Sequence, residues 1–433
     1  MIFEFENLGS IKKAELEVGN LTVICGKNNT GKTYLTYAVW GMLARRLSGV
    51  TKNPNRLPEA KKKITDQLIN NRNATIDLKD FENSFKDAVI KYIKGISPQL
   101  HRIFDVDKSF FKNTNISLKK LVVDYNKEIS VSISGHRINY RYEKNKDSSI
   151  INFRVSDSTK IEESDIEVVL SWLILDFLPL PFLISAQRDA IHLFGNAIND
   201  YARDKIRMLR NDNKENNFIR YALPLEENIR FVSNLSQISS QISFFYDTPL
   251  FTEIEEILGV EYDIFHESFT IKDKEGNITP AHLASTSVRA LADLHFYLKH
   301  RAQKNDLLMI DEPELSLHPE NQIKIARLIV KLVNAGLKVW ITTHSDYIIK
   351  ELNNCLMLSN KRIKNKKKLM KDLGYKDNEI LTPDDLKMYI AADGTLEKVA
   401  YDDFGVLKSA FDEAMITQNR NSNTIAEYIS QKK

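Results

Sequence analysis

Hydrophobic and polar residues change their spacing several times along the chain, and each spacing predicts a different element. Within residues 1–25, short alternating runs separated by Gly9-Ser10 and Gly19-Asn20 predict two or three short strands. The last run, 21–25, is apolar and β-branched, which predicts a buried strand, and residues 34–43 place apolar side chains on most faces of a helix. The chain therefore opens with a small strand layer that leads into a strand, a loop and a helix.

The pattern changes after residue 48. Up to residue 120 the chain is polar and rich in lysine, and apolar residues such as Phe85, Val89 and Ile93 recur at helical spacing. Between 121 and 155 the alternation has a period of two, which predicts strands with a hairpin turning near Gly135. We therefore expect an α+β insertion that splits the main domain. The expected units are an N-terminal core lobe at 1–47, the insertion at 48–180, a return strand and helical lid at 181–250, a C-terminal core lobe at 251–360, and a basic segment with a small α/β tail at 361–433.

The loop between the buried strand and the helix holds the first candidate chemistry. Residues 26–33 fit the pattern G-x-x-x-x-G-K-[ST], the phosphate-binding loop of P-loop NTPases. Glycines let backbone N–H groups point at phosphates, and the N-terminus of the following helix adds a positive field. Lys32 is predicted to reach the β- and γ-phosphates and to act in catalysis, and the Thr33 hydroxyl to ligate Mg²⁺. The predicted nucleotide-binding residues of the loop are Gly26, Asn28, Asn29, Thr30, Gly31, Lys32 and Thr33.

Two later strands are predicted to bring polar groups to the same site. The apolar run 307–312 ends in two carboxylates. Asp311 is suited to hold Mg²⁺ through water beside Thr33, and Glu312 to polarise the attacking water. The predicted strand 337–343 ends at His344, and α/β sheets bind ligands at the carboxyl ends of their strands. We therefore predict that His344 senses the γ-phosphate, and that ATP and Mg²⁺ are the cofactors.

Composition narrows the class of protein. Lys and Arg total 61 and Asp and Glu total 58 among 433 residues, so the overall charge does not favour nucleic-acid binding and any basic surface must be local. The two cysteines, Cys25 and Cys355, are far apart, which argues against a disulfide framework and suits a reducing cytoplasm. No signal-peptide pattern is present, and the longest apolar stretch, around 168–178, is too short to cross a bilayer. We expect a cytoplasmic protein with no membrane partner.

Three segments resemble the motifs of one ATPase family. Asp311-Glu312-Pro313-Glu314, Ser316-Leu317-His318-Pro319 and Thr342-Thr343-His344-Ser345 are similar to the Walker B, D-loop and switch-histidine segments of ABC-type ATPases, in particular the branch that contains the RecF, SMC-like and OLD-type proteins. The resemblance covers roughly residues 1–45 and 180–355. It implies an α/β fold: a P-loop NTPase with an ABC-type ATPase head, in which a mixed sheet is accompanied by a small antiparallel sub-sheet. It also implies a homodimer or higher homo-oligomer that encloses ATP between Lys32 of one chain and the signature segment of another.

The signature segment itself is matched by residues 283–291. There Ser285 would donate to the γ-phosphate of the opposite subunit from the start of a helix at 288–299. Ser287 stands where the family usually has glycine, and an ordinary helix N-cap explains Ser285 equally well. Gln187 is a candidate for the family's metal-sensing glutamine at the nucleotide site, and Arg188 resembles an arginine that OLD-like members carry after this strand.

Two basic stretches keep more than one interpretation. Charged residues between 203 and 220 predict either a solvated helical face or a phosphate-contacting surface. The lysine-rich run 361–371 predicts a solvated tail, a nucleic-acid patch or a protein-docking surface. OLD nucleases carry a TOPRIM nuclease domain in this region, which needs a Glu and an Asp-x-Asp cluster. This chain has only the adjacent pairs Asp384-Asp385 and Asp402-Asp403, so we expect no nuclease of its own.

Three hypotheses about function follow. The first is an ATPase that acts as sensor or scaffold for a separate effector protein, a nuclease or toxin, in bacterial anti-phage defence, similar to the ATPase subunits of the PARIS and Septu systems. The second is a RecF- or SMC-like ATPase that binds DNA in repair or recombination. The third is a transporter ATPase subunit, which the poor signature segment and the "LHP" D-loop disfavour. The first two predict the same chemistry, ATP hydrolysis in a closed dimer.

Overall fold

The structure is a computed structural model that describes most of the chain. The described residues are 1–44, 57–125, 128–134, 139–156, 161–194, 221–265, 268–402 and 405–406, together with 420, 421 and 424. Four predictions fall wholly or largely outside these residues: the hairpin turn near Gly135, the basic stretch 203–220, the residue Asp403, and the last part of the predicted α/β tail at 361–433.

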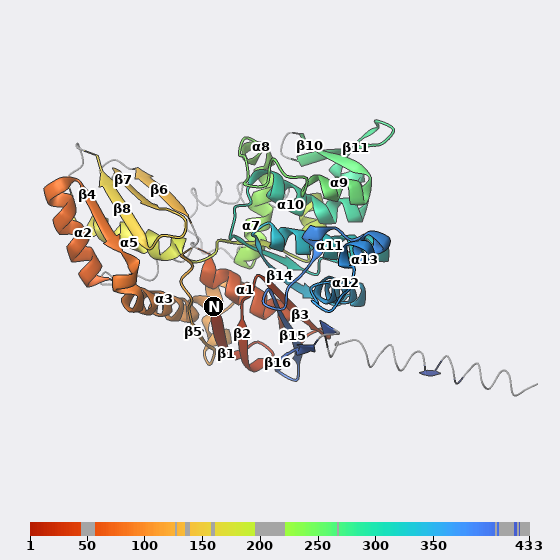
Figure 1. Cartoon of the computed structure of the whole chain (residues 1–433), viewed down its shortest axis with the longest axis horizontal. Coiled ribbons are helices and arrows are strands. Elements are labelled where there is room, and N and C mark those ends of the chain that lie inside the picture. Colours follow the sequence, from red (N-terminus) through yellow and green to blue (C-terminus); the bar gives the residue numbers. More distant parts are fainter. Residues whose placement is uncertain are drawn as a thin grey trace, which may run out of the picture.

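A six-stranded mixed sheet forms the centre of the main domain (Figure 1). Neighbouring strands are parallel except at one edge, where β16 is antiparallel to β15. The strands predicted at 21–25, 307–312 and 337–343 are adjacent in this sheet, which confirms the expected α/β P-loop fold. In spatial order the strands are β16 (Thr395–Lys398), β15 (Leu386–Ala392), β3 (Leu21–Gly26), β14 (Lys338–Thr343), β13 (Leu307–Asp311) and β9 (Pro181–Ile184).

Helices cover both faces of this sheet because its strands are apolar on both sides. Along β3, Ile24 faces the side covered by α1 (Lys32–Leu43), whereas Val23 and Cys25 belong to the core on the opposite face. That second face is covered by α10 (Thr286–His300), α11 (Pro319–Asn334) and α12 (Asp346–Met357). A parallel sheet buried on both faces requires nearly continuous hydrophobic strands, which is the pattern that predicted β3.

A separate three-stranded antiparallel sheet contains the N-terminus. Its central strand β1 (Ile2–Leu8) pairs with β2 (Ile11–Glu17) on one side and with β5 (Asn115–Lys120) on the other. The small antiparallel sub-sheet was expected, and it is confirmed. Its third strand differs from expectation because β5 comes from the predicted insertion.

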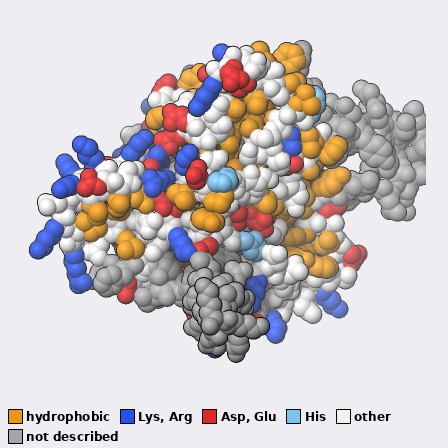
Figure 2. All heavy atoms as spheres, turned by 90° about the vertical axis from the view of Figure 1, so that its right-hand side faces the viewer, with side chains coloured by type: hydrophobic (Ala, Val, Ile, Leu, Met, Phe, Trp, Pro, Cys, Tyr) orange, Lys and Arg blue, Asp and Glu red, His pale blue; other side chains and the backbone are white. Residues whose placement is uncertain are grey.

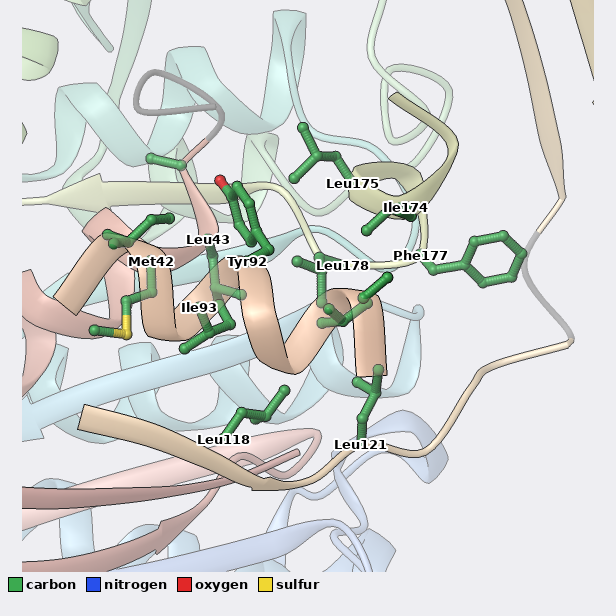
Figure 3. Close-up of a cluster of buried hydrophobic side chains, with 14 of the residues drawn as sticks. Met42, Leu43, Tyr92, Ile93, Leu118, Leu121, Ile174, Leu175, Phe177 and Leu178 are labelled. Carbon is green, nitrogen blue, oxygen red and sulfur yellow. The ribbon is translucent and has the colours of Figure 1, made fainter. Parts of the chain in front are cut away.

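Helix α3 (Glu82–Ile96) also ties the insertion to the main domain. Its apolar face carries Tyr92 and Ile93, which lie beside Leu43 of α1 in a shared buried cluster (Figure 3). Leu118 of β5 borders the same cluster, as does Phe177, which follows α5 (Glu163–Asp176). Residues on both sides of the predicted boundary at 47 and 48 therefore share one hydrophobic core.

The rest of the insertion is an α+β unit at one end of the molecule (Figure 1, orange to yellow). Its sheet is antiparallel, and three of its strands, β6, β7 and β8, arise from the period-two pattern predicted between 121 and 155. In spatial order the strands are β4 (Asn73–Asp77), β8 (Ile150–Val155), β7 (Asn139–Lys144) and β6 (Ile129–Ser134), and they are accompanied by α2 (Pro58–Asn71) and α5.

The remaining described elements surround the main sheet. An antiparallel sheet of β10 (Val260–Phe265), β11 (Ser268–Asp273) and β12 (Ile278–Pro280) precedes α10. The others are α4 (Leu100–Phe104), α7 (Leu223–Ser233), α8 (Leu235–Ile238), α9 (Thr252–Leu258), α13 (Lys366–Leu373), β17 (Tyr401–Asp402) and β18 (Gly405–Val406).

The segment after residue 360 corrects one expectation. It was predicted as a tail outside the ATPase core, yet β15 pairs in parallel with β3 along its whole length. The contact is close: a Cβ added to Gly26 would lie 2.4 Å from the carbonyl oxygen of Ala391. Gly26 also has φ 145°, a backbone conformation that favours glycine. The strand before the phosphate loop is therefore flanked by the C-terminal part of the chain.

One face of the molecule carries side chains of all types. On the face shown in Figure 2, basic, acidic and hydrophobic side chains are interspersed, and basic ones are most frequent toward its left edge. Among the described residues, no helix is both long enough and apolar enough to cross a bilayer.

Candidate nucleotide-binding site

The phosphate loop and the start of α1 form one wall of a cavity of about 780 Å³. Helix α1 begins at Lys32, two residues before the predicted stretch 34–43, with Gly31 at its N-cap. The Lys32 side chain folds back over the loop, where its Nζ donates to the carbonyl oxygens of Gly26 (3.0 Å) and Lys27 (2.8 Å). The lining residues are Asn7, Gly9, Ser10, Asn28, Asn29, Thr30, Gly31, Lys32, Thr33, Tyr34, Phe110, Glu312 and His344.

The end of β13 brings Asp311 to the loop. Thr33 Oγ1 donates to Asp311 Oδ2 at 3.4 Å, and Thr342 Oγ1 donates to Asp311 Oδ1. Burial raises the pKa of the Asp311 carboxyl, while the hydrogen bonds from Thr342 and Thr33 oppose that rise. The Thr33 hydroxyl and the Asp311 carboxylate are therefore close together, and both offer oxygen atoms of the kind that bind hard cations.

Glu312 and His344 also line the cavity. Glu312 has φ 54°, and its N–H donates to the carbonyl oxygen of Thr342 at 3.1 Å, so the chain turns sharply as β13 ends. Its carboxylate Oε1 lies 3.5 Å from Nε2 of His344. Burial and the nearby Lys32 charge lower the pKa of His344, which keeps its imidazole neutral at neutral pH. Burial also lowers the pKa of Lys32, and the carboxylates of Glu312 and Asp311 oppose that shift.

These oxygen groups fit a magnesium ion that is held largely by phosphate and water. Mg²⁺ in nucleotide sites uses one or two protein ligands and keeps several waters. Thr33 and Asp311 are the matching groups, and the described residues contain no cluster of three or more His, Cys, Asp or Glu side chains that could hold a metal by themselves. The residues at the loop therefore suit Mg²⁺ together with a triphosphate.

Glu314 is a site residue to which the sequence assigned no role beyond its motif. Its Oε1 accepts from the backbone N–H of His344 at 2.5 Å and from Thr343 Oγ1 at 3.0 Å. Burial raises the pKa of its carboxyl. Glu314 therefore joins the loop after β13 to the histidine at the end of β14.

Arg188 is a second residue whose role emerges from the structure. Its buried guanidinium donates to the carbonyl oxygens of Asp311 (2.9 Å) and Glu312 (2.8 Å). It also donates to Ala290 in α10 (2.8 Å) and to Ser185 after β9 (3.1 Å). Burial lowers the pKa of Arg188, and the charge of Asp293 opposes this most strongly. Arg188 thus holds the end of the carboxylate strand against α10, a contact that its resemblance to an OLD-type arginine could not specify.

Two predicted nucleotide-site residues lie apart from this cavity. Gln187 is exposed, and it is not among the lining residues. Ser285 is also exposed, and it caps α10 by accepting from the N–H of Val288 at 3.4 Å, with Ser287 Oγ 2.9 Å away. The N-cap interpretation of Ser285 therefore describes the single chain, and any contact of Ser285 with a nucleotide would involve another copy.

Comparisons with known proteins agree with this geometry at the level of a family. A model of the AAA ATPase domain matches residues 1–349. No curated protein matches the sequence.

Solved structures that match include three SMC head domains. The one from Thermotoga maritima is 11% identical over 93% of this chain and 98% of that chain, with a TM-score of 0.31. The one with an extended coiled coil bound to the C-terminal domain of ScpA, derived from Pyrococcus furiosus, is 12% identical over 97% and 98%, with a TM-score of 0.33. An SMC head bound to the C-winged helix domain of ScpA is 12% identical over 92% and 96%, with a TM-score of 0.35. Because these scores are low, we base the assignment on the family match and on the site.

Proposed function

The chain belongs to the AAA ATPase domain family, and we propose that it binds ATP with Mg²⁺ in the cavity around Lys32 and hydrolyses it. One observation carries this proposal. The carboxyl ends of three neighbouring strands, β3, β14 and β13, bring together the side chains that transfer of a phosphoryl group to water requires. Those groups are Lys32, Thr33, Asp311, Glu312 and His344.

Lys32 and Thr33 are assigned to binding. An ammonium group has three N–H donors, and two of those of Lys32 meet the carbonyl oxygens of Gly26 and Lys27. The same amino group is then held at the loop surface, where it stabilises the charge of the β- and γ-phosphates. When bound, Mg²⁺ would be held by Thr33 and Asp311 and would neutralise charge that develops on the phosphates.

Glu312 and His344 are assigned to the chemical step. Glu312 orients the attacking water and accepts its proton, because its carboxylate lines the cavity. His344 lies 3.5 Å from that carboxylate and, being neutral, can donate one N–H to a γ-phosphate oxygen. Lys32 contributes to this step as well, by stabilising the transition-state charge.

A second copy of the chain is proposed to complete the site. Ser285 is exposed and Ser287 is half-buried at the N-terminus of α10, a 15-residue helix, and neither lines the cavity of its own chain. Helix N-termini favour anions. In a dimer that encloses two ATP molecules, this helix terminus would face the γ-phosphate bound by Lys32 of the partner.

The finer role rests on the resemblance of the motifs. We propose that closing of the ATP-bound dimer controls a separate effector protein, a nuclease or toxin, in anti-phage defence. One feature of the described structure supports this proposal: the ATPase head carries an inserted α+β unit that shares its hydrophobic core with α1. DNA binding in repair is the competing function, and purification of the Glu312→Gln variant from its native host distinguishes the two.

Two substitutions test the nucleotide site. Lys32→Ala should abolish ATP binding, seen by calorimetry as a loss of at least about 100-fold in affinity, since it removes the charge on the phosphates. Glu312→Gln should bind ATP–Mg²⁺ normally but hydrolyse it at least about 100-fold more slowly, because an amide cannot accept the proton. Normal affinity in the first variant or wild-type turnover in the second would refute the assignment.

A further inference from the structure

The nucleotide cavity has an aromatic wall that the proposed phosphate chemistry does not use. Phe110 and Tyr34 both line it, together with the phosphate loop, Glu312 and His344. Tyr34 follows Thr33 directly in α1, whereas Phe110 belongs to the insertion, in a short 3-10 turn at Lys108–Phe111. Phe110 is 56% exposed.

The two rings are held in a defined arrangement. They are nearly parallel, with an interplanar angle of 9° and centroids 6.5 Å apart. Phe104 stacks on Tyr34 at 5.3 Å, and buried Phe111 packs edge-on against Phe110 at 5.1 Å. Asp107 fixes the turn by accepting from the N–H of Ser109 at 2.8 Å.

Gly9 supports the Tyr34 ring from the N-terminal sheet. A Cβ at Gly9 would come within 2.9 Å of three ring carbons of Tyr34, so the glycine backbone lies directly against this ring. The turn that carries Gly9 and Ser10 also lines the cavity. The aromatic wall is therefore built from three parts of the chain that are distant in sequence.

We propose that Phe110 and Tyr34 form a platform on which the nucleobase of the bound nucleotide stacks. This inference rests on the proposed ATP site and extends it, because it assigns the base to a residue of the insertion. Aromatic side chains bind bases by stacking, and an exposed ring gains contact area when a flat base covers it. The chemical class is a purine nucleotide, since a purine offers the larger stacking surface.

The test compares ATP with a probe that has no base. Binding of ATP–Mg²⁺ and of inorganic tripolyphosphate is measured by calorimetry for the full chain and for Phe110→Ala, Phe110→Tyr and Lys32→Ala. Phe110→Ala should weaken ATP binding by roughly 10-fold or more and leave tripolyphosphate binding within about 2-fold, because only the base contact is lost. Phe110→Tyr should restore ATP affinity, and the preference for ATP over UTP should narrow in Phe110→Ala.

Phe244→Ala is the matched control. Phe244 is 53% exposed, packs edge-on against a neighbouring phenylalanine, Phe245, and does not line the cavity, so ATP affinity should be unchanged. Unchanged ATP affinity in Phe110→Ala would overturn the platform, and so would an equal loss of tripolyphosphate binding. If the wild-type chain bound neither ligand, or if Lys32→Ala bound both normally, the ATP site itself would fail. If the binding of ATP and of tripolyphosphate depended on Lys32 but not on Phe110, the platform would be refuted and the proposed ATP site would stand.

Discussion

Glu314 connects two loops of the site that carry separate candidate groups. It follows Glu312 by two residues, and its Oε1 accepts from the His344 N–H and from Thr343 Oγ1. These two bonds fix the backbone at the end of β14 relative to the end of β13. The 3.5 Å separation between Glu312 and His344 therefore depends on a third carboxylate that lines no part of the cavity.

Removing that acceptor should slow the chemistry more than it weakens binding. We expect Glu314→Ala to lower kcat by about 10- to 100-fold, because small displacements of positioned groups cost rates of that order. Its ATP affinity should stay within about 3-fold, since the phosphate loop is untouched. Steady-state kinetics and calorimetry measure the two quantities.

The conservative variant Glu314→Gln distinguishes the hydrogen-bonding role of Glu314 from its negative charge. The side-chain carbonyl of Glu314→Gln can accept the same two hydrogen bonds, so this variant should retain most of the wild-type kcat. If Glu314→Gln were as slow as Glu314→Ala, the hydrogen-bonding role assigned to Glu314 would be wrong.

Strand β15 supports the strand that leads into the phosphate loop. It pairs with β3 as far as Gly26, the first residue of the loop pattern. The close approach of the Ala391 carbonyl oxygen leaves no space for a Cβ at Gly26. The C-terminal part of the chain thus imposes its own requirement for glycine at this position, in addition to the phosphate chemistry.

Gly26→Ala should therefore destabilise the fold even without nucleotide. We expect a loss of about 3 kcal/mol, from steric overlap with β15 together with an unfavourable φ. The matched control is Gly276→Ala, since Gly276 has φ 87° but no neighbour within 4 Å of the added Cβ, and should lose only about 1 kcal/mol. Thermal unfolding of both apo variants measures the difference, and equal shifts in Tm would contradict the contact with β15.

At the scale of the whole molecule, the exposed start of α10 and the cavity lie on different parts of one chain. Ser285 caps α10 and is open to solvent, whereas Lys32 is buried at the loop. Arg188 links the two regions, since it bonds Ala290 of α10 as well as the backbone of Asp311 and Glu312. A single buried side chain therefore joins α10 to the end of β13.

Glu312→Gln should accumulate the closed assembly. With ATP–Mg²⁺ present, its mass in solution should be twice the 49.9 kDa of one chain or a higher multiple, because hydrolysis no longer reopens the site. Adding Ser285→Arg should return it to one chain, since a large cation at the helix terminus blocks the approach of the partner. Light scattering on a sizing column measures the mass, and a monomer under all conditions would refute the dimer.

The same sample tests the finer role. Tagged Glu312→Gln is purified from its native host with nuclease treatment, and proteins that co-elute in fixed ratio are identified. A nuclease or toxin would support the control of an effector. A preparation with no protein partner, which retains DNA when nuclease treatment is omitted, would instead support the repair function.

The sequence by itself determined the local parts of this protein. The loop 26–33, the strand–helix unit around it and the polar ends of β13 and β14 all follow from spacing within a few residues. Because parallel strands align their carboxyl ends, the convergence of Asp311, Glu312 and His344 on Lys32 could also be predicted. The period of two likewise predicted β6, β7 and β8, and the helical spacing predicted α3, whereas β4 and β5 lie in the stretch 48–120, where only helices were expected.

Only the tertiary structure determined which segments, distant in sequence, pair with these strands and join the site. The pairing of β5 with β1 and of β15 with β3 uses backbone hydrogen bonds, which every residue can make, so no local pattern specifies the partner. Arg188 binds backbone carbonyl oxygens for the same reason, without a signature in the residues it contacts. Phe110 is one exposed aromatic among many until the fold brings it to the cavity beside Tyr34.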